Sequence, residues 1–173
     1  MKKLLMAFAI IFSVSALHAE ADYYAVLSAW APGQIPMAPS SQLNGLRVTL
    51  FYGDCTRLNG LDLALLGANR VRERFNGLAI APVFNRANSA AGLDIGFANV
   101  VENEFSGLQV GAWNHAGSGY GSQWGVVNTA GYFAGLQLGL FNWSDDLDGL
   151  QLGLVNVIAD QTVCVFPFLN IGF

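Results

Sequence analysis

The chain has 173 residues, enough for one domain, and 53% of them are hydrophobic, a high share for a soluble domain. Its formal net charge is −4, and its only lysines are the second and third residues; from Glu20 onward, six Arg stand against twelve Asp and Glu. An acidic chain without lysine argues against nucleic acid and against anionic lipid as partners.

The first element is a predicted secretory signal peptide over residues 1–19. Two lysines precede an apolar run over residues 4–14, small residues follow, and the charge turns acidic at Glu20. The pattern fits cleavage after Ala19 or after Ala21. The apolar run is shorter than the ~20 residues that a membrane-spanning helix needs, which favours a cleaved signal over an anchor. We therefore expect an exported protein of the cell surface, the periplasm or the outer membrane.

Residues 20–44 form an N-terminal strand and capping segment in this interpretation. Tyr23 to Trp30 is a candidate strand, and the glycine and three prolines between 32 and 39 then interrupt regular structure.

Residues 45–173 form a predicted repeat domain of nine rows. The spacings between row starts run from 14 to 17 residues, and the starts are Gly45, Gly60, Gly77, Gly92, Gly107, Gly121, Gly135, Gly149 and Val163. The next position is mostly leucine: Leu46, Leu61, Leu78, Leu93, Leu108, Ser122, Leu136, Leu150 and Cys164. Two further on stand Val48, Leu63, Ile80, Ile95, Val110, Trp124, Leu138, Leu152 and Phe166. Two further again stand Leu50, Leu65, Pro82, Phe97, Ala112, Val126, Leu140, Leu154 and Phe168. This period of two predicts a strand with one buried face.

The intervening positions form polar or glycine columns. They read Gln109, Gln123, Gln137 and Gln151, then Gly111, Gly125, Gly139 and Gly153, then Asn99, Asn114, Asn128, Asn142, Asn156 and Asn170. Large apolar residues often stand two places before a row start: Leu58, Phe75, Phe105, Phe133 and Leu147.

Stacking like positions about 4.8 Å apart explains these columns, so we predict an all-β parallel β-solenoid of about nine coils. The leucine columns should fill the core, asparagines should form an amide ladder at one corner, and glycines should occupy the other. The Gln and Gly columns should then face outward as the interaction face. On this assignment Leu138→Asp abolishes folding and Gln137→Ala is mild. A fourth apolar column, from Phe51 to Leu169, either points outward as an apolar stripe that marks an interaction surface or bends inward near the asparagines to complete the core, and we expect the inward bend.

The alternative fold is a small up-and-down β-barrel of the outer membrane, structural or pore-like in function. The strand of about seven residues is short for a tilted spanning strand. An antiparallel meander also gives no stacking reason to repeat every row, so the solenoid is favoured.

No catalytic, cofactor or metal site is predicted. His115 is expected to be an exposed turn residue, and the acidic cluster 145–148 lacks the ligand spacing of calcium loops. Asp62 and Asp94 share a column but lie two coils apart, which disfavours a carboxylate-pair enzyme. Cys55 and Cys164 are too far apart to bond in a solenoid. The expected partner is an unidentified protein or another envelope component, with membrane association open.

The Gly-Leu-Gln rows resemble a family of exported bacterial surface-repeat proteins of the Leptospira type, whose repeats read G-L-Q-x-G-x-x-N. The resemblance covers about 45–173. It implies export and surface display, and it carries over no biochemical activity and no residue role. The sequence thus predicts a non-enzymatic exported surface or envelope repeat protein.

Overall fold

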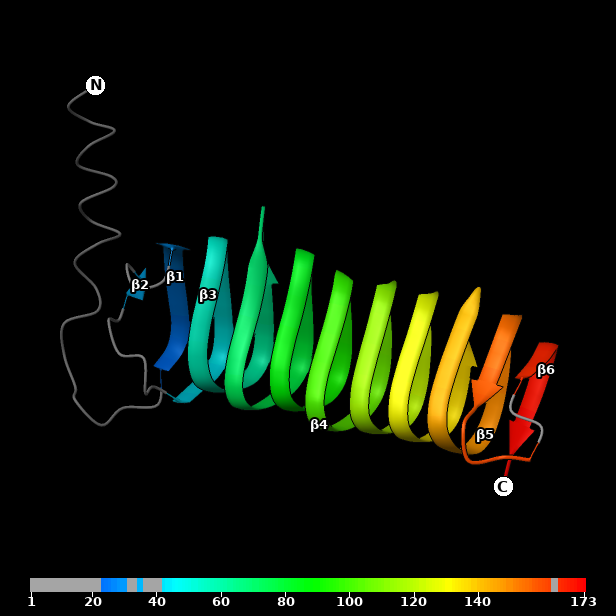
Figure 1. The fold of residues 1–173 in the computed structure, drawn as a ribbon. Helices are drawn as coiled ribbons and strands as arrows, with labels where there is room; N and C mark the ends of the chain where they lie inside the picture. The colour runs from blue at the N-terminus through cyan, green and yellow to red at the C-terminus, as the bar shows by residue number, and fades with distance from the viewer. Residues whose placement is uncertain (1–22, 31–33, 36–41, 163–164) are drawn as a thin grey trace, which may run out of the picture.

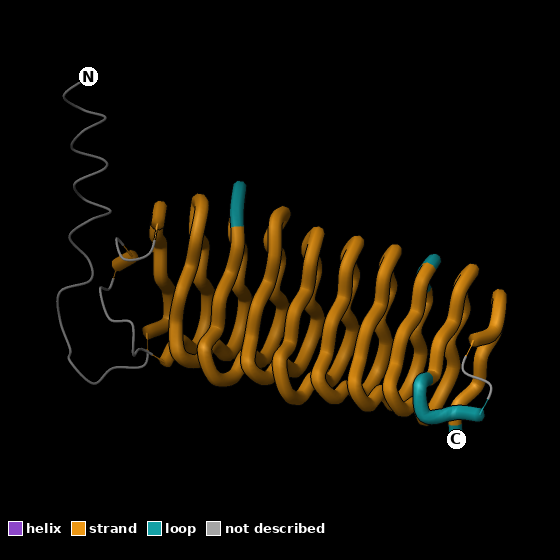
Figure 2. Tube along the Cα trace, in the orientation of Figure 1, coloured by secondary structure: helices purple, strands orange, loops and turns teal. Residues whose placement is uncertain are grey.

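The computed structural model describes residues 23–30, 34–35, 42–162 and 165–173 (Figures 1 and 2). The predicted signal peptide, much of the capping segment and Cys164 lie outside these residues. The strands are β1 (Tyr23–Trp30), β2 (Gln34–Ile35), β3 (Gln42–Ala64), β4 (Ala68–Leu138), β5 (Phe141–Ile158) and β6 (Val165–Gly172). The described residues contain no helix long and apolar enough to cross a membrane.

The strands wind into a β-solenoid of about seven turns, in which each coil stacks against the one before it, from left to right in Figure 1. β1 pairs with β3, β3 with β4, and β4 with β5, always in parallel. Gly60 faces Gly77 and Gly135 faces Gly149, so the predicted row starts are in register. Parallel pairing confirms the solenoid and excludes the antiparallel meander.

The ninth predicted row is not a coil. β6 pairs antiparallel with β5, and Gly149 faces Gly172. The register shifts where Pro167 stands, beside Phe168, which has a positive φ of 69°. Pro167 has no backbone N–H to donate to the ladder, which accounts for the broken register, and β6 covers the last coil. At the other end, β2 pairs antiparallel with β1.

The row-start glycines take a backbone conformation that other residues rarely adopt. All eight, from Gly45 to Gly149, have φ between 124° and 153°. A Cβ at Gly135 would overlap the carbonyl oxygen of Gly121 in the coil below. This confirms that glycine is required at one corner of every coil.

The inside–outside assignment of the rows is the reverse of the prediction. Gln137 and Asn142 are 0% exposed, whereas Leu140 is 55% exposed. The apolar part of the core comes from the return side of each coil, where Phe105 and Phe133 are buried as predicted. The leucine columns therefore do not fill the core, and Leu138→Asp is no longer expected to abolish folding.

Candidate functional site

The glutamine column forms a hydrogen-bonded ladder inside the coils. Nε2 of Gln123, Gln137 and Gln151 each donates to Oε1 of the glutamine one coil earlier, at 2.8 Å. The same Nε2 atoms also donate to backbone carbonyls six residues further along the chain, at 3.0–3.4 Å. Stacked primary amides satisfy one another, so burial leaves few polar atoms unpaired.

The asparagine column forms a second, parallel ladder. It runs through Asn85, Asn99, Asn114, Asn128, Asn142 and Asn156, with Nδ2 to Oδ1 distances of 2.8–2.9 Å. Asn69 extends it toward the N-terminal end, at 3.4 Å from Asn85. Asn69 was not assigned to the asparagine column from the sequence, because its row is longer and displaces it from the column position. Asn170 is also buried, but it lies on the antiparallel strand β6. Its partner in the neighbouring strand β5 is Gln151, so Asn170 lies outside the asparagine ladder.

The glycines between these ladders are required for space. A Cβ at Gly125 would lie 2.7 Å from Asn114 Nδ2, and one at Gly139 would lie 2.6 Å from Asn128 Nδ2. The asparagine amides therefore fill the volume that a side chain would need. The predicted Gln–Gly interaction face, together with the asparagine corner, is consequently an interior scaffold, because its amides are buried and hydrogen-bonded to one another.

Charged residues replace the glutamines at the N-terminal end of the same column. Arg47 donates to both carboxylate oxygens of Asp62, at 2.7 and 2.5 Å, and both side chains are 1% exposed. Burial acts to lower the pKa of Arg47, but the charge and hydrogen bonds of Asp62 outweigh it and raise the pKa. This pair occupies the first two places of the column, and the rows of Ala79 and Asp94 separate it from the glutamine ladder, which begins at Gln109.

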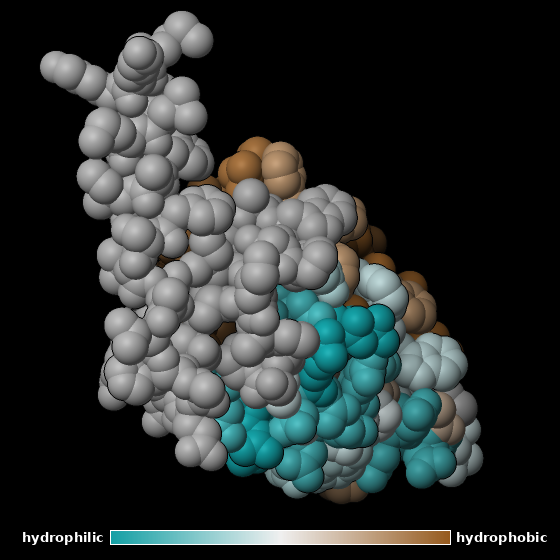
Figure 3. Space-filling view, turned by 90° about the vertical axis from the view of Figure 1, so that its left-hand side faces the viewer, coloured by the Kyte–Doolittle hydropathy of each residue, from teal (hydrophilic) through white to brown (hydrophobic). Residues whose placement is uncertain are grey.

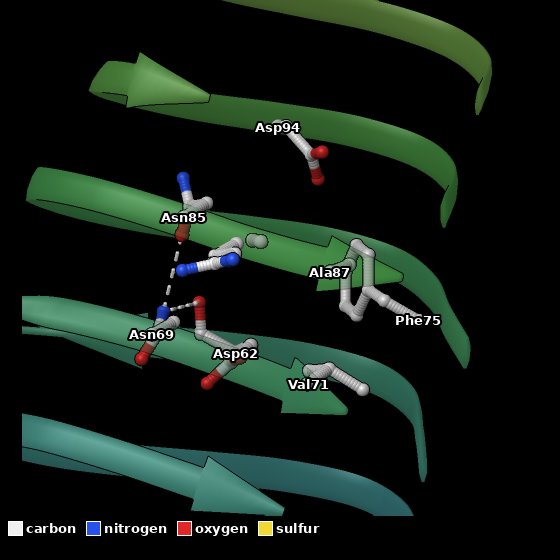
Figure 4. Close-up of a pocket in the computed structure, with 9 residues that line it drawn as sticks. Asp62, Asn69, Val71, Phe75, Asn85, Ala87 and Asp94 are labelled. Atoms are coloured by element: carbon white, nitrogen blue, oxygen red, sulfur yellow. Dashed lines mark hydrogen bonds between the residues drawn. The ribbon is translucent and has the colours of Figure 1, made fainter. Parts of the chain in front are cut away.

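Asp94 is a buried carboxylate without such a partner. It is 3% exposed and points into a small cavity bordered by Asp62, Ala79 and Asn85, with room for about one water molecule (Figure 4). Burial, with a smaller effect from the charge of Asp62, raises the pKa of Asp94 to about 7. No hydrogen bond joins its carboxylate to the described residues. Ala79, which lies between the two acids, is too small to fill the column.

The outward side of the rows is apolar. We call it the apolar face: the three columns that begin at Leu46, Val48 and Leu50 and run through the rows from Gly45 to Gly149. Only Ser122 among these positions is polar, and none is charged. Hydrophobic residues gather along one flank of the rod in Figure 3. The large members at least 36% exposed are Leu65, Ile80, Phe97, Trp124, Val126, Leu140, Leu152 and Leu154.

The apolar face has a hollow, and the highly exposed side chain of Phe97 lies at its border. The hollow is lined by Leu65, Ile80, Pro82 and Phe97, among others, where Pro82 occupies a column place that holds larger residues in neighbouring coils. Phe97, one coil further on in the same column, is 67% exposed. The face therefore carries a recess and a protrusion about 4.8 Å apart along the rod.

The fourth apolar column also points outward, contrary to the expected inward bend. Phe51, Leu66 and Trp113 are 45%, 62% and 47% exposed. Two consecutive outward residues in each row show that the chain turns a corner there, immediately before the buried asparagine. This column extends the apolar surface around the edge of the apolar face.

The exposed charges lie on the opposite part of the coils, in the rows before Gly107 and after Gly135. Exposed ion pairs link successive coils: Arg57 with Glu73 at 2.6 Å, Arg72 with Asp54 at 2.6 Å, and Arg86 with Glu102. Exposed pairs of this kind contribute about 0–1 kcal/mol each. The solenoid is therefore amphipathic across its width.

Groups that would indicate chemistry are sparse in the described part of the chain. His115 is partly buried, with Nδ1 3.0 Å from Thr129 Oγ1, and burial lowers its pKa. Within residues 42–162 and 165–173, no three His, Cys, Asp or Glu side chains are placed to hold a metal ion. Cys55 is a buried free thiol.

Comparisons with protein-family profiles, with curated proteins and with solved structures found no match to the chain.

Proposed function

We propose that the chain is a non-enzymatic, exported repeat protein of the cell surface or envelope, with an interaction role. The observation that carries the proposal is the apolar face, with three columns over eight rows and no charged side chain. Exposed apolar surfaces larger than a few hundred Å² usually mark interaction sites.

The scaffold suits such a role. A β-solenoid is compatible with a structural or interaction repeat protein, because each coil contacts only its neighbours and presents one extended surface. The amide ladders hold successive coils in register, and this does not require the outward apolar side chains to pack in the core. The apolar residues are thus available to a partner rather than committed to the core.

Two features of the sequence support export and surface display. The predicted signal peptide precedes the solenoid, and the Gly-Leu-Gln rows resemble surface-repeat proteins. The polar side chains that repeat along the rod support a non-enzymatic role, since the Gln and Asn amides are occupied by one another.

Cell fractionation tests this proposal with two matched single-charge variants. Phe97→Asp places a carboxylate on the apolar face, and Ser106→Asp places one at an exposed position off that face. We expect the wild-type chain and Ser106→Asp outside the cytoplasm in envelope-associated or assembled form. Phe97→Asp should be exported but released, with an unchanged circular dichroism spectrum.

Two results would overturn the proposal. Retention of the wild-type chain in the cytoplasm would contradict export. Identical distribution and assembly of all three chains would show that the apolar face is not an interaction surface.

A further inference from the structure

We propose that the apolar face is covered by a second copy of this chain, so that two solenoids pack face to face as a symmetric dimer. The inference rests on the proposed function, which requires the face to be an interaction surface, and it names the occupant. Four observations lead to it: the area of the face, its shape, the strands at the two ends of the rod, and the location of its charges.

The area matches what a stable dimer needs. Each outward side chain covers about 4.8 Å along the rod and about 6.6 Å across it, or roughly 32 Å². Three columns over eight rows then give about 760 Å² per copy. Full overlap would bury about 1,500 Å² in total, within the range of stable protein interfaces, about 1,200–2,000 Å².

The shape is self-complementary. A twofold axis that lies in the plane between the two faces, perpendicular to the rods and passing between Pro82 and Phe97, places each Phe97 over the hollow of the other copy. This isologous arrangement makes both contacts equivalent. The rows from Gly45 to Gly121 would overlap and bury about 1,100 Å² in total, less than full overlap but above the ~1,000 Å² that a specific interface needs. An exposed aromatic side chain that enters a pocket is also the usual centre of an interface.

The described strands at the two ends of the rod differ from the parallel coils between them. β6 reverses direction over the last coil, and its register is broken at Pro167. β2 likewise lies antiparallel to β1 at the other end. Because neither end strand continues the parallel stacking of the coils, the apolar face is the larger surface that the rod presents to a second copy.

The charge distribution favours a second copy over a lipid surface. The apolar face carries no Lys or Arg at its 24 positions, and the chain as a whole has a net charge of −4. Stable attachment to bilayers commonly needs a basic patch beside the apolar contact. The ion pairs between coils, such as Arg57 with Glu73, are off the face, so like charges in a dimer would remain in solvent.

Sedimentation equilibrium and light scattering of the purified chain test the dimer. We expect twice the chain mass at micromolar concentration for the wild type and for Ser106→Asp. Phe97→Asp should weaken self-association by about 30-fold or more, because it buries a carboxylate at the centre of the interface. Circular dichroism should show that all three chains keep the same strand content.

A second experiment distinguishes a second copy of the chain from a lipid surface as the partner of the apolar face. It measures flotation of the chain with neutral phosphatidylcholine vesicles. If the wild type is monomeric and floats while Phe97→Asp does not, the dimer inference fails and the interaction face stands. If the wild type is monomeric and neither chain floats, the dimer inference fails, and the fractionation assay decides the proposed function separately. If Phe97→Asp and the wild type dimerise equally, the dimer uses another surface and the inference is wrong.

Discussion

Asp94→Gln should make the protein more stable, although it alters a buried residue. The carboxylate lies in the column of the glutamine ladder, one coil before Gln109, and has no hydrogen-bond partner among the described residues. A glutamine there would accept from Gln109 Nε2 and continue the ladder by one coil. It would also occupy part of the cavity beside Ala79.

The size of the effect follows from the pKa of Asp94, which burial raises from 3.8 to about 7. Between these pH values the folded chain holds a proton that the unfolded chain has lost. The free energy of unfolding therefore falls as pH rises from about 4 to about 7, by roughly 4 kcal/mol for this group. The amide does not titrate. The variant should thus gain about 4 kcal/mol over the wild type at pH 8, but only about 2 kcal/mol at pH 5.

Urea unfolding followed by circular dichroism at pH 5 and pH 8 measures this difference. Asp148→Asn is the matched control, because it removes one carboxylate from an exposed position and should change the unfolding free energy by at most about 0.5 kcal/mol. An equal gain at both pH values would show that the buried charge is not responsible. A variant less stable than the wild type at pH 8 would refute the reasoning about the ladder.

Three further predictions address the interior. Gln137→Ala should lower the unfolding free energy by about 2–4 kcal/mol, because it removes the donor to Gln123 Oε1 and opens a gap. Leu138→Ala, on the apolar face, should cost less than about 1 kcal/mol, and equal losses in urea unfolding would contradict the inside–outside assignment. Gly125→Ala should lower the melting temperature measured by circular dichroism, since its methyl would lie 2.7 Å from Asn114 Nδ2; an unchanged melting temperature would mean that the amide ladder can shift. Cys55 should resist alkylation at pH 8 until urea unfolds the chain, because burial raises its pKa to about 11; peptide mass spectrometry resolves this site, and rapid labelling of the folded chain would contradict its burial.

The architecture could be predicted because the repeat itself encodes it. Glycine at the first eight row starts indicates a recurrent backbone conformation, and the structure shows a positive φ at each of the eight. Asparagine at one column position requires a stacked neighbour of the same kind. The hydrogen bond from Asn128 to Asn142 shows that ladder directly. Parallel stacking follows, because like residues meet only when coils run in the same direction.

The candidate site was predicted on the wrong side of the sheet because burial was inferred from polarity. The sequence contained a signal against that inference. One leucine column accommodates Pro82, Phe97 and Ala112 in successive rows, a range of volumes that a close-packed interior does not tolerate. The glutamine column is uniform from Gln109 to Gln151, as an interior ladder must be. Variation in side-chain volume was therefore the better guide to exposure.

The sequence by itself determined the period, the corners and the asparagine ladder, because these depend on identical residues meeting at a fixed spacing. The glutamine ladder was not predicted, because the glutamine column was expected to face outward. Only the tertiary structure decided which face is inside. Burying a single amide costs free energy because its hydrogen bonds to water are lost. The cost is offset when amides in the neighbouring coils form those hydrogen bonds, which requires the coils to be stacked. The reversal of β6 was also decided there, since its antiparallel pairing with β5 exists only once the last coil has formed. These two outcomes leave the leucines, which were predicted to form the core, as the surface that the protein presents.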